Sequence, residues 1–306
     1  MNFTRPMLAA PLLSPKTEHN DKNILEAMLK LKMPVLATTK RDGIRGLRLN
    51  GTDVSRTLKT IPNKSICDRA KRLPAGLDFE HWVEGLEYNE IESIVMSRQH
   101  IKSDEIEFHV LDLYHPTATY NDRLALVESS IWSDWKDVKF ESPTLCITAQ
   151  ELFDFFIRKE QEESEGICFR TPDSPYKMGR STLREQYLVK LARYSTSEAM
   201  ILDFIEQFEN GNRTKRNAVG MMDRSSNQEN MVGKDTLGAL VVSDVKTGVV
   251  FNIGTGVGWT DKWRQDVWQH RSEYKSKIIA YKYKGFGEKN LPRSPIGKGM
   301  RTTIDL

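Results

Sequence analysis

The stretch Met33-Pro-Val-Leu-Ala-Thr-Thr-Lys40-Arg41-Asp42-Gly43-Ile44-Arg45 carries the most informative pattern in the chain. Its first eight residues predict a strand that runs to Lys40. Asp42 and Gly43 then predict a tight turn, because glycine permits backbone geometries that other residues avoid. A lysine at the end of a strand, followed by Asp-Gly and then Arg45, is typical of a nucleophile turn. For this hexapeptide alone, an exposed turn with an ion pair is the alternative.

A lysine attacks an electrophile only as the neutral amine, and its unperturbed pKa is about 10.4. Burial and neighbouring cations lower the pKa of a lysine, so we expect both around Lys40. Asp42 would orient or neutralise the amine. Arg45 would hold an anionic substrate.

Regular elements are predicted on both sides of this turn. Apolar residues on one face predict a helix over residues 21–31, and Asn50-Gly51 predicts the turn of a hairpin over residues 46–56. Thr148 and Glu151 form a capping-box signature ahead of another helix. The apolar stripe of that helix is formed by Leu152, Phe155 and Phe156.

Strand patterns dominate from about residue 186. The predicted strands cover residues 186–194, 199–208, 237–243, 249–253 and 277–283. A helix over residues 261–275 follows Thr260 as its N-cap, and we expect its Trp263 and Trp268 to pack in the core. A short β-barrel with one helix suits this part, and we place the domain boundary near residues 195–200.

Charge divides the 306-residue chain unevenly. Residues 211–306 hold 17 Lys and Arg against 9 Asp and Glu, a net of +8, whereas residues 1–210 hold 28 against 33, a net of −5. A basic last third predicts contact with a polyanion, and a solvated surface is the alternative. The polar segment 212–235 is either a disordered loop or a binding appendage.

Several classes of protein do not fit this composition. No apolar run approaches the roughly 20 residues that span a bilayer. The three cysteines, Cys67, Cys146 and Cys168, are widely spaced and suggest neither a disulfide framework nor a zinc cluster. The histidines show no metal-ligand spacing, so we expect no zinc. A reducing, cytosolic setting is expected.

The order of further motifs resembles the nucleotidyltransferase superfamily, and most of all the small ATP-dependent DNA ligases of large DNA viruses and phages. Its first motif, Lys-x-Asp-Gly-x-Arg, matches residues 40–45. Its third motif, Asp-Gly-Glu, is matched by Asp78-Phe79-Glu80, and its fifth, Lys-x-Lys, by Lys190-Leu191-Ala192. Other matches are residues 37–39, 55–57, 108–112, 165–170 and 176–183, and fragments of the last third.

This resemblance implies an α+β fold with two domains. Residues 1–197 would form a nucleotidyltransferase (adenylation) domain with ATP-grasp-like antiparallel sheets and helices. Residues 198–306 would form an OB-fold β-barrel that binds DNA, with a latch-like segment inserted at residues 212–235.

The resemblance also implies an ATP-dependent DNA ligase that seals nicks through lysyl-AMP and DNA-adenylate intermediates. Its cofactors would be ATP and Mg²⁺. Its partner would be nicked duplex DNA, and it would not bind a membrane. The ligase would be a monomer that closes around the DNA. It would act in the cytoplasm of a host cell, as a viral or phage protein.

Individual roles follow from the same resemblance. Lys40 would be the catalytic nucleophile. Glu80 and Glu165 would hold metal or ribose hydroxyls, since carboxylate oxygen is a suitable Mg²⁺ ligand. The implied cofactor-binding residues are Thr38, Arg45, Arg56, Glu80, Leu111, Glu165, Arg180 and Lys190.

Three residues depart from the family pattern. Phe79 replaces the motif glycine, where it would crowd the nucleotide unless the local backbone stays extended. Leu111 occupies the adenine-stacking aromatic position, and Ala192 replaces the second lysine of the fifth motif. Arg193 should point to the opposite face of the strand and so would not substitute for that lysine.

Three alternatives stay open at this point. An RNA ligase of the same superfamily would join RNA ends, although the OB-like last third argues against it. A capping guanylyltransferase would use GTP. A catalytically impaired nick-binding protein would bind duplex DNA without forming an adenylate.

Overall fold

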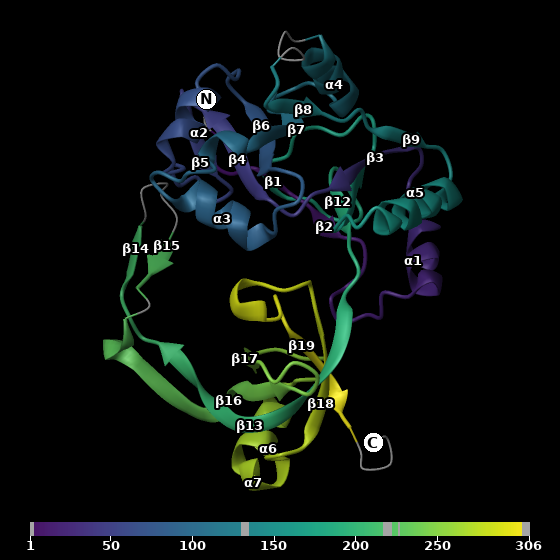
Figure 1. The fold of residues 1–306 in the computed structure, drawn as a ribbon. Coiled ribbons are helices and arrows are strands. Elements are labelled where there is room, and N and C mark those ends of the chain that lie inside the picture. The colour runs from purple at the N-terminus through teal and green to yellow at the C-terminus, as the bar shows by residue number, and fades with distance from the viewer. Residues whose placement is uncertain (1–2, 130–134, 217–221, 226, 302–306) are drawn as a thin grey trace. The chain divides into compact units, whose positions relative to one another are not determined.

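The structure is a computed structural model, and it describes residues 3–129, 135–216, 222–225 and 227–301 (Figure 1). The chain divides into two compact units, residues 1–193 and 194–306. The first unit holds two five-stranded sheets with helices packed on them, and the second holds one five-stranded sheet with helices. This mixture of sheets and helices confirms the predicted α+β class.

The first sheet of the N-terminal unit has the strand order β2-β12-β10-β3-β9. Helices α1, Asp21–Met28, and α5, Ala149–Gln161, lie side by side and pack on one face of this sheet (Figure 1). The strands are Ala10–Pro11 (β2), Val35–Lys40 (β3), Thr144–Cys146 (β9), Gly166–Arg170 (β10) and Val189–Leu191 (β12).

Both helices begin at the N-caps that their sequences supply. The side chain of Asn20 accepts a hydrogen bond from the backbone N–H of Asn23, and Thr148 accepts one from Glu151. The Glu151 carboxylate accepts from the backbone N–H of Ile147, one residue earlier than in a regular capping box. The local signal therefore gave the start of α5 correctly.

The second sheet of this unit has the order β5-β4-β6-β7-β8. Helices α2 (Lys64–Ala70), α3 (Tyr88–Met96) and α4 (Tyr120–Glu128) contribute to the core on it. The β4–β5 hairpin turns at Asn50 and Gly51, whose φ angles of 47° and 78° suit the predicted turn. The strands are Ile44–Leu49 (β4), Thr52–Ser55 (β5), Leu77–Trp82 (β6), Glu107–Leu113 (β7) and Val138–Phe140 (β8).

The predicted nucleophile turn connects these two sheets. Strand β3 of the first sheet ends at Lys40, and β4 of the second begins at Ile44. Only residues 41–43 lie between them. A third, short pairing joins β1, Met7–Leu8, in parallel to β11, Gly179–Arg180. The lysine therefore stands where the two sheets meet.

The C-terminal unit is built on the strand order β17-β16-β13-β18-β19. Gly256, just after β17, pairs with Gly297 of β19, so the two edges of the sheet meet and form a barrel. A Cβ atom on Gly256 would lie 2.3 Å from Nε1 of Trp259, so the Trp259 ring occupies the space that a side chain there would need. The strands are Ser195–Asn210 (β13), Met231–Asp244 (β16), Val250–Ile253 (β17), Ile278–Tyr283 (β18) and Ile296–Met300 (β19).

The helix predicted over residues 261–275 is divided in two. Helix α6, Asp261–Gln269, begins at the N-cap Thr260, and α7, Arg271–Tyr274, follows a break at His270. Trp263 and Trp268 are partly buried against the barrel core, as expected.

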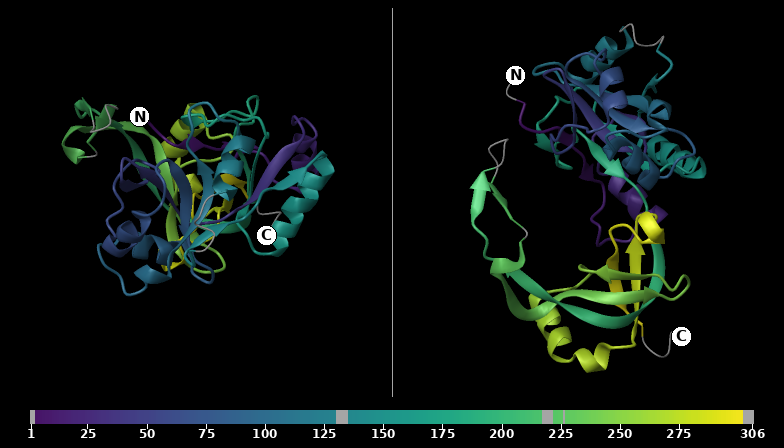
Figure 2. Two further views of the ribbon diagram at one scale, coloured as in Figure 1. Left: turned by 90° about the horizontal axis from the view of Figure 1, so that it is seen from above. Right: turned by 60° about the vertical axis from the view of Figure 1, so that its left-hand side comes forward.

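The segment predicted as a loop or appendage contains a small hairpin. Strand β14, Thr214–Arg216, pairs with β15, Met222–Arg224, beyond the long β13–β16 ribbon (Figure 2). Within the predicted segment, residues 217–221 and 226 lie outside the described residues. In the described ranges, no helix has the length and apolar character needed to cross a membrane.

Candidate active site

Lys40 shares one sheet face with other polar side chains. Thr38 lies opposite Cys168 on the neighbouring strand, and Cys168 lies opposite Lys190 on the next. Residues two apart on a strand share a face, so Lys40 is on this face too. These four residues are half-buried, whereas the residues that alternate with them pack against α1 and α5. The sheet therefore brings the predicted residues Thr38, Lys40 and Lys190 together.

The amine of Lys40 forms an ion pair with Glu165, which directly precedes β10. Nζ donates a hydrogen bond to Oε2 of Glu165, and the two side chains are 20% and 19% exposed. Burial lowers the pKa of Lys40, but Glu165, Cys168 and Glu80 together raise it above its usual value. The expected depression by neighbouring cations was wrong, because the adjacent charge is a carboxylate.

Glu80 on β6 is the second carboxylate of the predicted set. In the described part of the chain no hydrogen bond or ion pair holds its carboxylate. Burial raises the pKa of Glu80 to about 7, although Lys40 and Arg45 act in the opposite direction. Its electrostatic coupling to Lys40 places both side chains in one neighbourhood.

Arg45 is held by Asp78, the first residue of the third motif. Nε of Arg45 donates to Oδ1 of Asp78 at 2.7 Å, and Nη2 donates to Oδ2 of the same carboxylate. Its Nη1 donates to the Met7 carbonyl at 2.6 Å, and the Tyr176 hydroxyl donates to Asp78 at 2.7 Å. Bidentate pairing fixes the guanidinium firmly. Asp78 was not predicted as the partner of Arg45, although both residues belong to recognised motifs.

Phe79 does not crowd this face. It is fully buried, and its ring meets Phe108 edge-on with 5.3 Å between centroids. Phe79 lies in the extended strand β6, and an extended backbone is the condition under which a bulky side chain was expected to fit. Successive residues of a strand point to opposite faces, so Phe79 points away from the face of Asp78 and Glu80.

Leu111 sits in a β-bulge. Asp78 of β6 pairs with Asp112, and Phe79 pairs with Val110, so the register passes over Leu111. A bulge commonly re-aims a side chain near a functional site. Leu111 is half-buried and belongs to none of the apolar core clusters of the described chain.

Two other predicted cations, Arg56 and Arg180, are exposed. Arg56 lies just after β5. Arg180 lies on β11, and its Nη1 donates to the Ala9 carbonyl at 2.8 Å. Among the described residues neither guanidinium bonds to Lys40, so the roles of Arg56 and Arg180 stay predictions.

Arg193 points away from the lysine face, as expected. Its Nε donates to both carboxylate oxygens of Glu160 on α5, at 2.8 and 2.9 Å. Its Nη2 pairs with Asp21 of α1, and its guanidinium lies 5.3 Å from the ring centroid of Phe156. These are the helices on the opposite side of the sheet, so Arg193 does not replace the missing lysine of the fifth motif.

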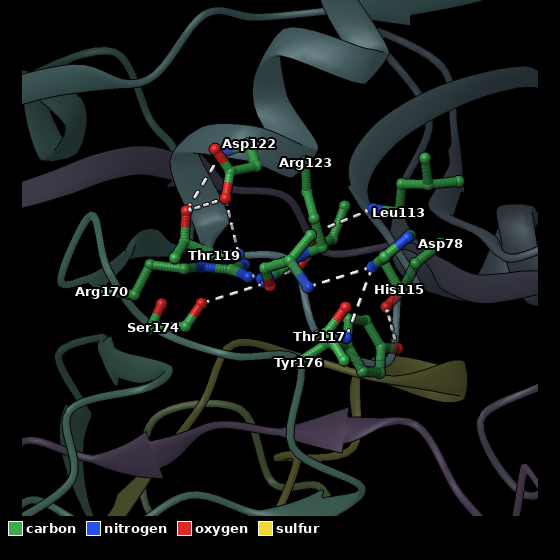
Figure 3. A network of polar contacts seen from close by, with 12 residues as sticks. Asp78, Leu113, His115, Thr117, Thr119, Asp122, Arg123, Arg170, Ser174 and Tyr176 are labelled. Atoms are coloured by element: carbon green, nitrogen blue, oxygen red, sulfur yellow. Dashed lines mark hydrogen bonds and ion pairs between the residues drawn. The ribbon is translucent and has the colours of Figure 1, made fainter.

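A buried network of charges lies beside this region (Figure 3). Arg123 of α4 is fully buried, and its Nε and Nη2 donate to the two oxygens of Asp112 at 2.7 and 3.0 Å. Arg170 donates to the same carboxylate and lies 4.1 Å from the Tyr120 ring centroid. The sequence gave no signal for Arg123, because its partners are 11 and 51 residues away along the chain.

Comparisons with known proteins agree on one family. A family model described as the DNA ligase OB-like domain matches residues 230–301. The solved structure of the Chlorella virus DNA ligase-adenylate is 28% identical, with a TM-score of 0.53, and the match covers 98% of this chain and 100% of that one. These matches support a small viral or phage ATP-dependent DNA ligase. The chain resembles the small viral members of that family in length and in both domains.

Another solved structure supports the fold of this ligase. A Lig E DNA ligase is 19% identical, covers 87% of this chain and 92% of that one, and gives a TM-score of 0.66. A search of curated proteins gave no match. The OB-like match spans all of β16 to β19, which identifies the barrel of the ligase as its OB-fold.

Proposed function

We propose that this DNA ligase seals nicks in duplex DNA and that Lys40 carries AMP between ATP and the nick. The observation that supports this most directly is the Lys40–Glu165 ion pair, whose two side chains are each about one-fifth exposed. It lies on one sheet face with Thr38 and Lys190, in a chain with the ligase fold.

In the first step the neutral amine of Lys40 attacks the α-phosphorus of ATP. A phosphorus–nitrogen bond forms, the bond to the bridging oxygen of pyrophosphate breaks, and the amine loses a proton. Glu165 already accepts a hydrogen bond from Nζ, so it is placed to receive that proton. Because the ion pair favours the ammonium form, binding of ATP must separate or discharge the pair before attack.

Two later steps would use the same centre. An oxygen of the 5′-phosphate at the nick attacks the phosphorus of lysyl-AMP, and the phosphorus–nitrogen bond breaks. The 3′-hydroxyl then attacks the activated 5′-phosphate, which forms the phosphodiester and releases AMP. Each step develops negative charge on phosphate oxygens, which positioned cations stabilise. The candidates are Arg45, Arg56, Arg180 and Lys190, and Thr38 and Leu111 would contact the nucleotide.

Glu80 and Glu165 suit a magnesium site. No cluster of three or more protein ligands occurs in the described ranges, but Mg²⁺ usually takes only one or two carboxylates and completes its shell with waters and substrate phosphates. The Glu80 carboxylate, with no hydrogen bond among the described residues, fits this donor set. The bound ion would neutralise charge on the phosphate oxygens.

The barrel would bind the duplex without reading its sequence. Contacts from the basic last third to phosphates predict an affinity that falls steeply with salt. We propose that residues 212–235 act as a latch on a monomeric ligase. The ligase would then act in replication or repair in the host cytoplasm.

The decisive test uses ATP labelled at the α- or the γ-phosphate. Wild-type ligase with Mg²⁺ should retain the α-label covalently and release the γ-label. Addition of nicked DNA should then remove the α-label from the ligase. Lys40→Ala should form no adenylate. Lys71→Ala is the matched control, because Lys71 is an exposed lysine paired only with Asp68 in the described structure. A labelled adduct that survives in Lys40→Ala would refute the role of Lys40.

The remaining alternatives are separated by substrate. A nicked RNA duplex sealed faster than nicked DNA would indicate an RNA ligase. Covalent GMP in place of AMP would indicate a capping enzyme. Duplex binding without an adduct would indicate the nick-binding protein that the Leu111 and Ala192 departures suggest.

A further inference from the structure

The turn after Lys40 rests directly on strand β6. A Cβ atom on Gly43 would lie 2.4 Å from the carbonyl oxygen of His81 and 2.9 Å from Cγ of Glu80. No side chain fits at residue 43, so the backbone of the turn touches β6 without an intervening layer. The course of residues 41–45 therefore depends on β6, both on Glu80 of the third motif and on His81, which lies just beyond that motif.

The imidazole of His81 connects this turn to a second strand. Its Nδ1 lies 2.8 Å from the carbonyl oxygen of Ile44, and its Nε2 lies 3.1 Å from Oδ2 of Asp53 on β5. Both side chains are fully buried. A carbonyl oxygen only accepts, so Nδ1–H must be the donor to Ile44. His81 is thus the link between the nucleophile turn and β5.

Close packing fixes the ring of His81. A Cβ on Gly46 would lie 2.5 Å from Cε1 of His81 and 2.5 Å from Cε2 of Phe79. The Phe79 and His81 rings meet nearly at right angles with 5.1 Å between centroids. A ring held in this way has one rotamer, which is what a positioning group requires.

Asp53 shows that the link has a cost. Its Oδ1 is buried and has no hydrogen-bond partner among the described residues, while Oδ2 faces His81. A buried polar atom without a partner destabilises the fold. An apolar pair at these two positions would avoid that cost, which points to a role other than stability.

We propose that His81 is a positioning residue for nucleotidyl transfer at Lys40. Its Nδ1–H holds the Ile44 carbonyl and so sets the path of residues 41–45, which fixes the place of the Lys40 amine relative to Glu80 and Arg45. His81 acts through the backbone and does not touch substrate. The inference rests on the proposed function of Lys40. Small displacements of reacting groups lower rates strongly, so a loose turn should slow the transfer.

Two amide substitutions separate the two hydrogen bonds of His81. In His81→Asn the amide nitrogen lies near the place of Nδ1 and can still donate to Ile44. In His81→Gln it lies near the place of Nε2 and reaches only residue 53. Both are made with Asp53→Asn, so that no unpaired carboxylate stays buried, and the Asp53→Asn protein is the reference.

Two quantities are measured for each variant. They are the single-turnover rate of lysyl-AMP formation at saturating ATP and the KM for ATP in the same reaction. His81→Asn should stay within about 3-fold of the reference, and His81→Gln should lose about 10²-fold in rate with KM unchanged. Their melting temperatures should agree. His109→Asn and His109→Gln are the matched control. His109 is a strand histidine bonded to Glu107, and its two variants should not differ in rate.

Equal rates for the two His81 variants would overturn the inference, and so would a loss confined to KM. If both variants fail to fold, Phe79→Leu loosens the ring without removing a hydrogen bond. An approximately 10-fold loss of rate with KM unchanged then supports the inference, and an unchanged rate overturns it. Absence of any adenylate in wild-type ligase would refute the proposed function, and this inference with it.

Discussion

Two groups of charges in the N-terminal unit differ in how they are held. Lys40 and Glu165 have one ion pair between them and are each about one-fifth exposed. Asp112, by contrast, is buried and receives hydrogen bonds from Arg123 and Arg170. In the proposed mechanism the Lys40–Glu165 pair must separate, and this pair has few partners and some access to solvent. A charge that maintains the fold is surrounded by several partners.

The first way to break this comparison is to remove the buried acid. Asp112→Asn should lower the free energy of unfolding of the first unit by about 3–5 kcal/mol, because it leaves two buried arginines without a full countercharge. Urea unfolding measures the loss. Asp68→Asn, at an exposed pair with Lys71, should show no measurable change. A similar result for both variants would remove the distinction between the two kinds of pair.

The second prediction concerns the partly exposed Lys40–Glu165 pair. Glu165→Gln should slow lysyl-AMP formation by about 10²-fold, on the scale of a lost group that stabilises developing charge. The melting temperature should change little, because a partly solvated ion pair contributes little to stability. A large loss of stability with normal adenylation would reverse the assignment of this pair.

The third prediction extends the comparison to the barrel. The Asp244 carboxylate accepts hydrogen bonds from the Tyr281 hydroxyl at 2.7 Å and from the Ser197 hydroxyl at 2.8 Å. Although burial opposes it, these bonds and those from Thr247 lower the pKa of Asp244 to about 2. A carboxyl group whose pKa is lowered in the folded state stabilises the fold at pH values above its pKa in the unfolded state, which is near 4. This contribution is lost as the pH falls from about 4 to about 2.

The corresponding experiment compares two asparagine variants. Asp244→Asn should remove about 2 kcal/mol of barrel stability at pH 7 and flatten its dependence on acid. Asp203→Asn, at an exposed position on β13, is the control and should leave the acid transition unchanged. Thermal unfolding at several pH values between 2 and 7 provides the measurement. An acid transition that keeps its wild-type midpoint in Asp244→Asn would contradict the assignment.

The smallest expected effect is that of Arg193. Arg193→Gln should leave lysyl-AMP formation within about 2-fold of wild type, since the guanidinium is bound to Glu160 and Asp21 on the far side of the sheet. The same labelled-ATP assay checks this. A strong loss of adenylation would mean that Arg193 does serve in place of the lysine absent at residue 192.

Local patterns in the sequence were sufficient for much of the fold. The strand before Lys40, the Asn50-Gly51 hairpin and the cap at Thr148 all formed as predicted. Each depends on interactions within a few residues, such as alternation along a strand or a side chain that bonds the backbone three residues on. Where local signals were mixed, as at His270, the predicted helix was divided.

The sequence by itself determined that Lys40 ends a strand at a turn and that a basic β-rich region follows. Only the tertiary structure decided which charges meet. Lys40 pairs with Glu165 across 125 positions, and Arg45 pairs with Asp78 across 33. It also decided that Phe79 enters the core and that His81 supports the turn. Such contacts depend on strand register and on packing between distant segments, and short-range spacing in one sequence does not specify either.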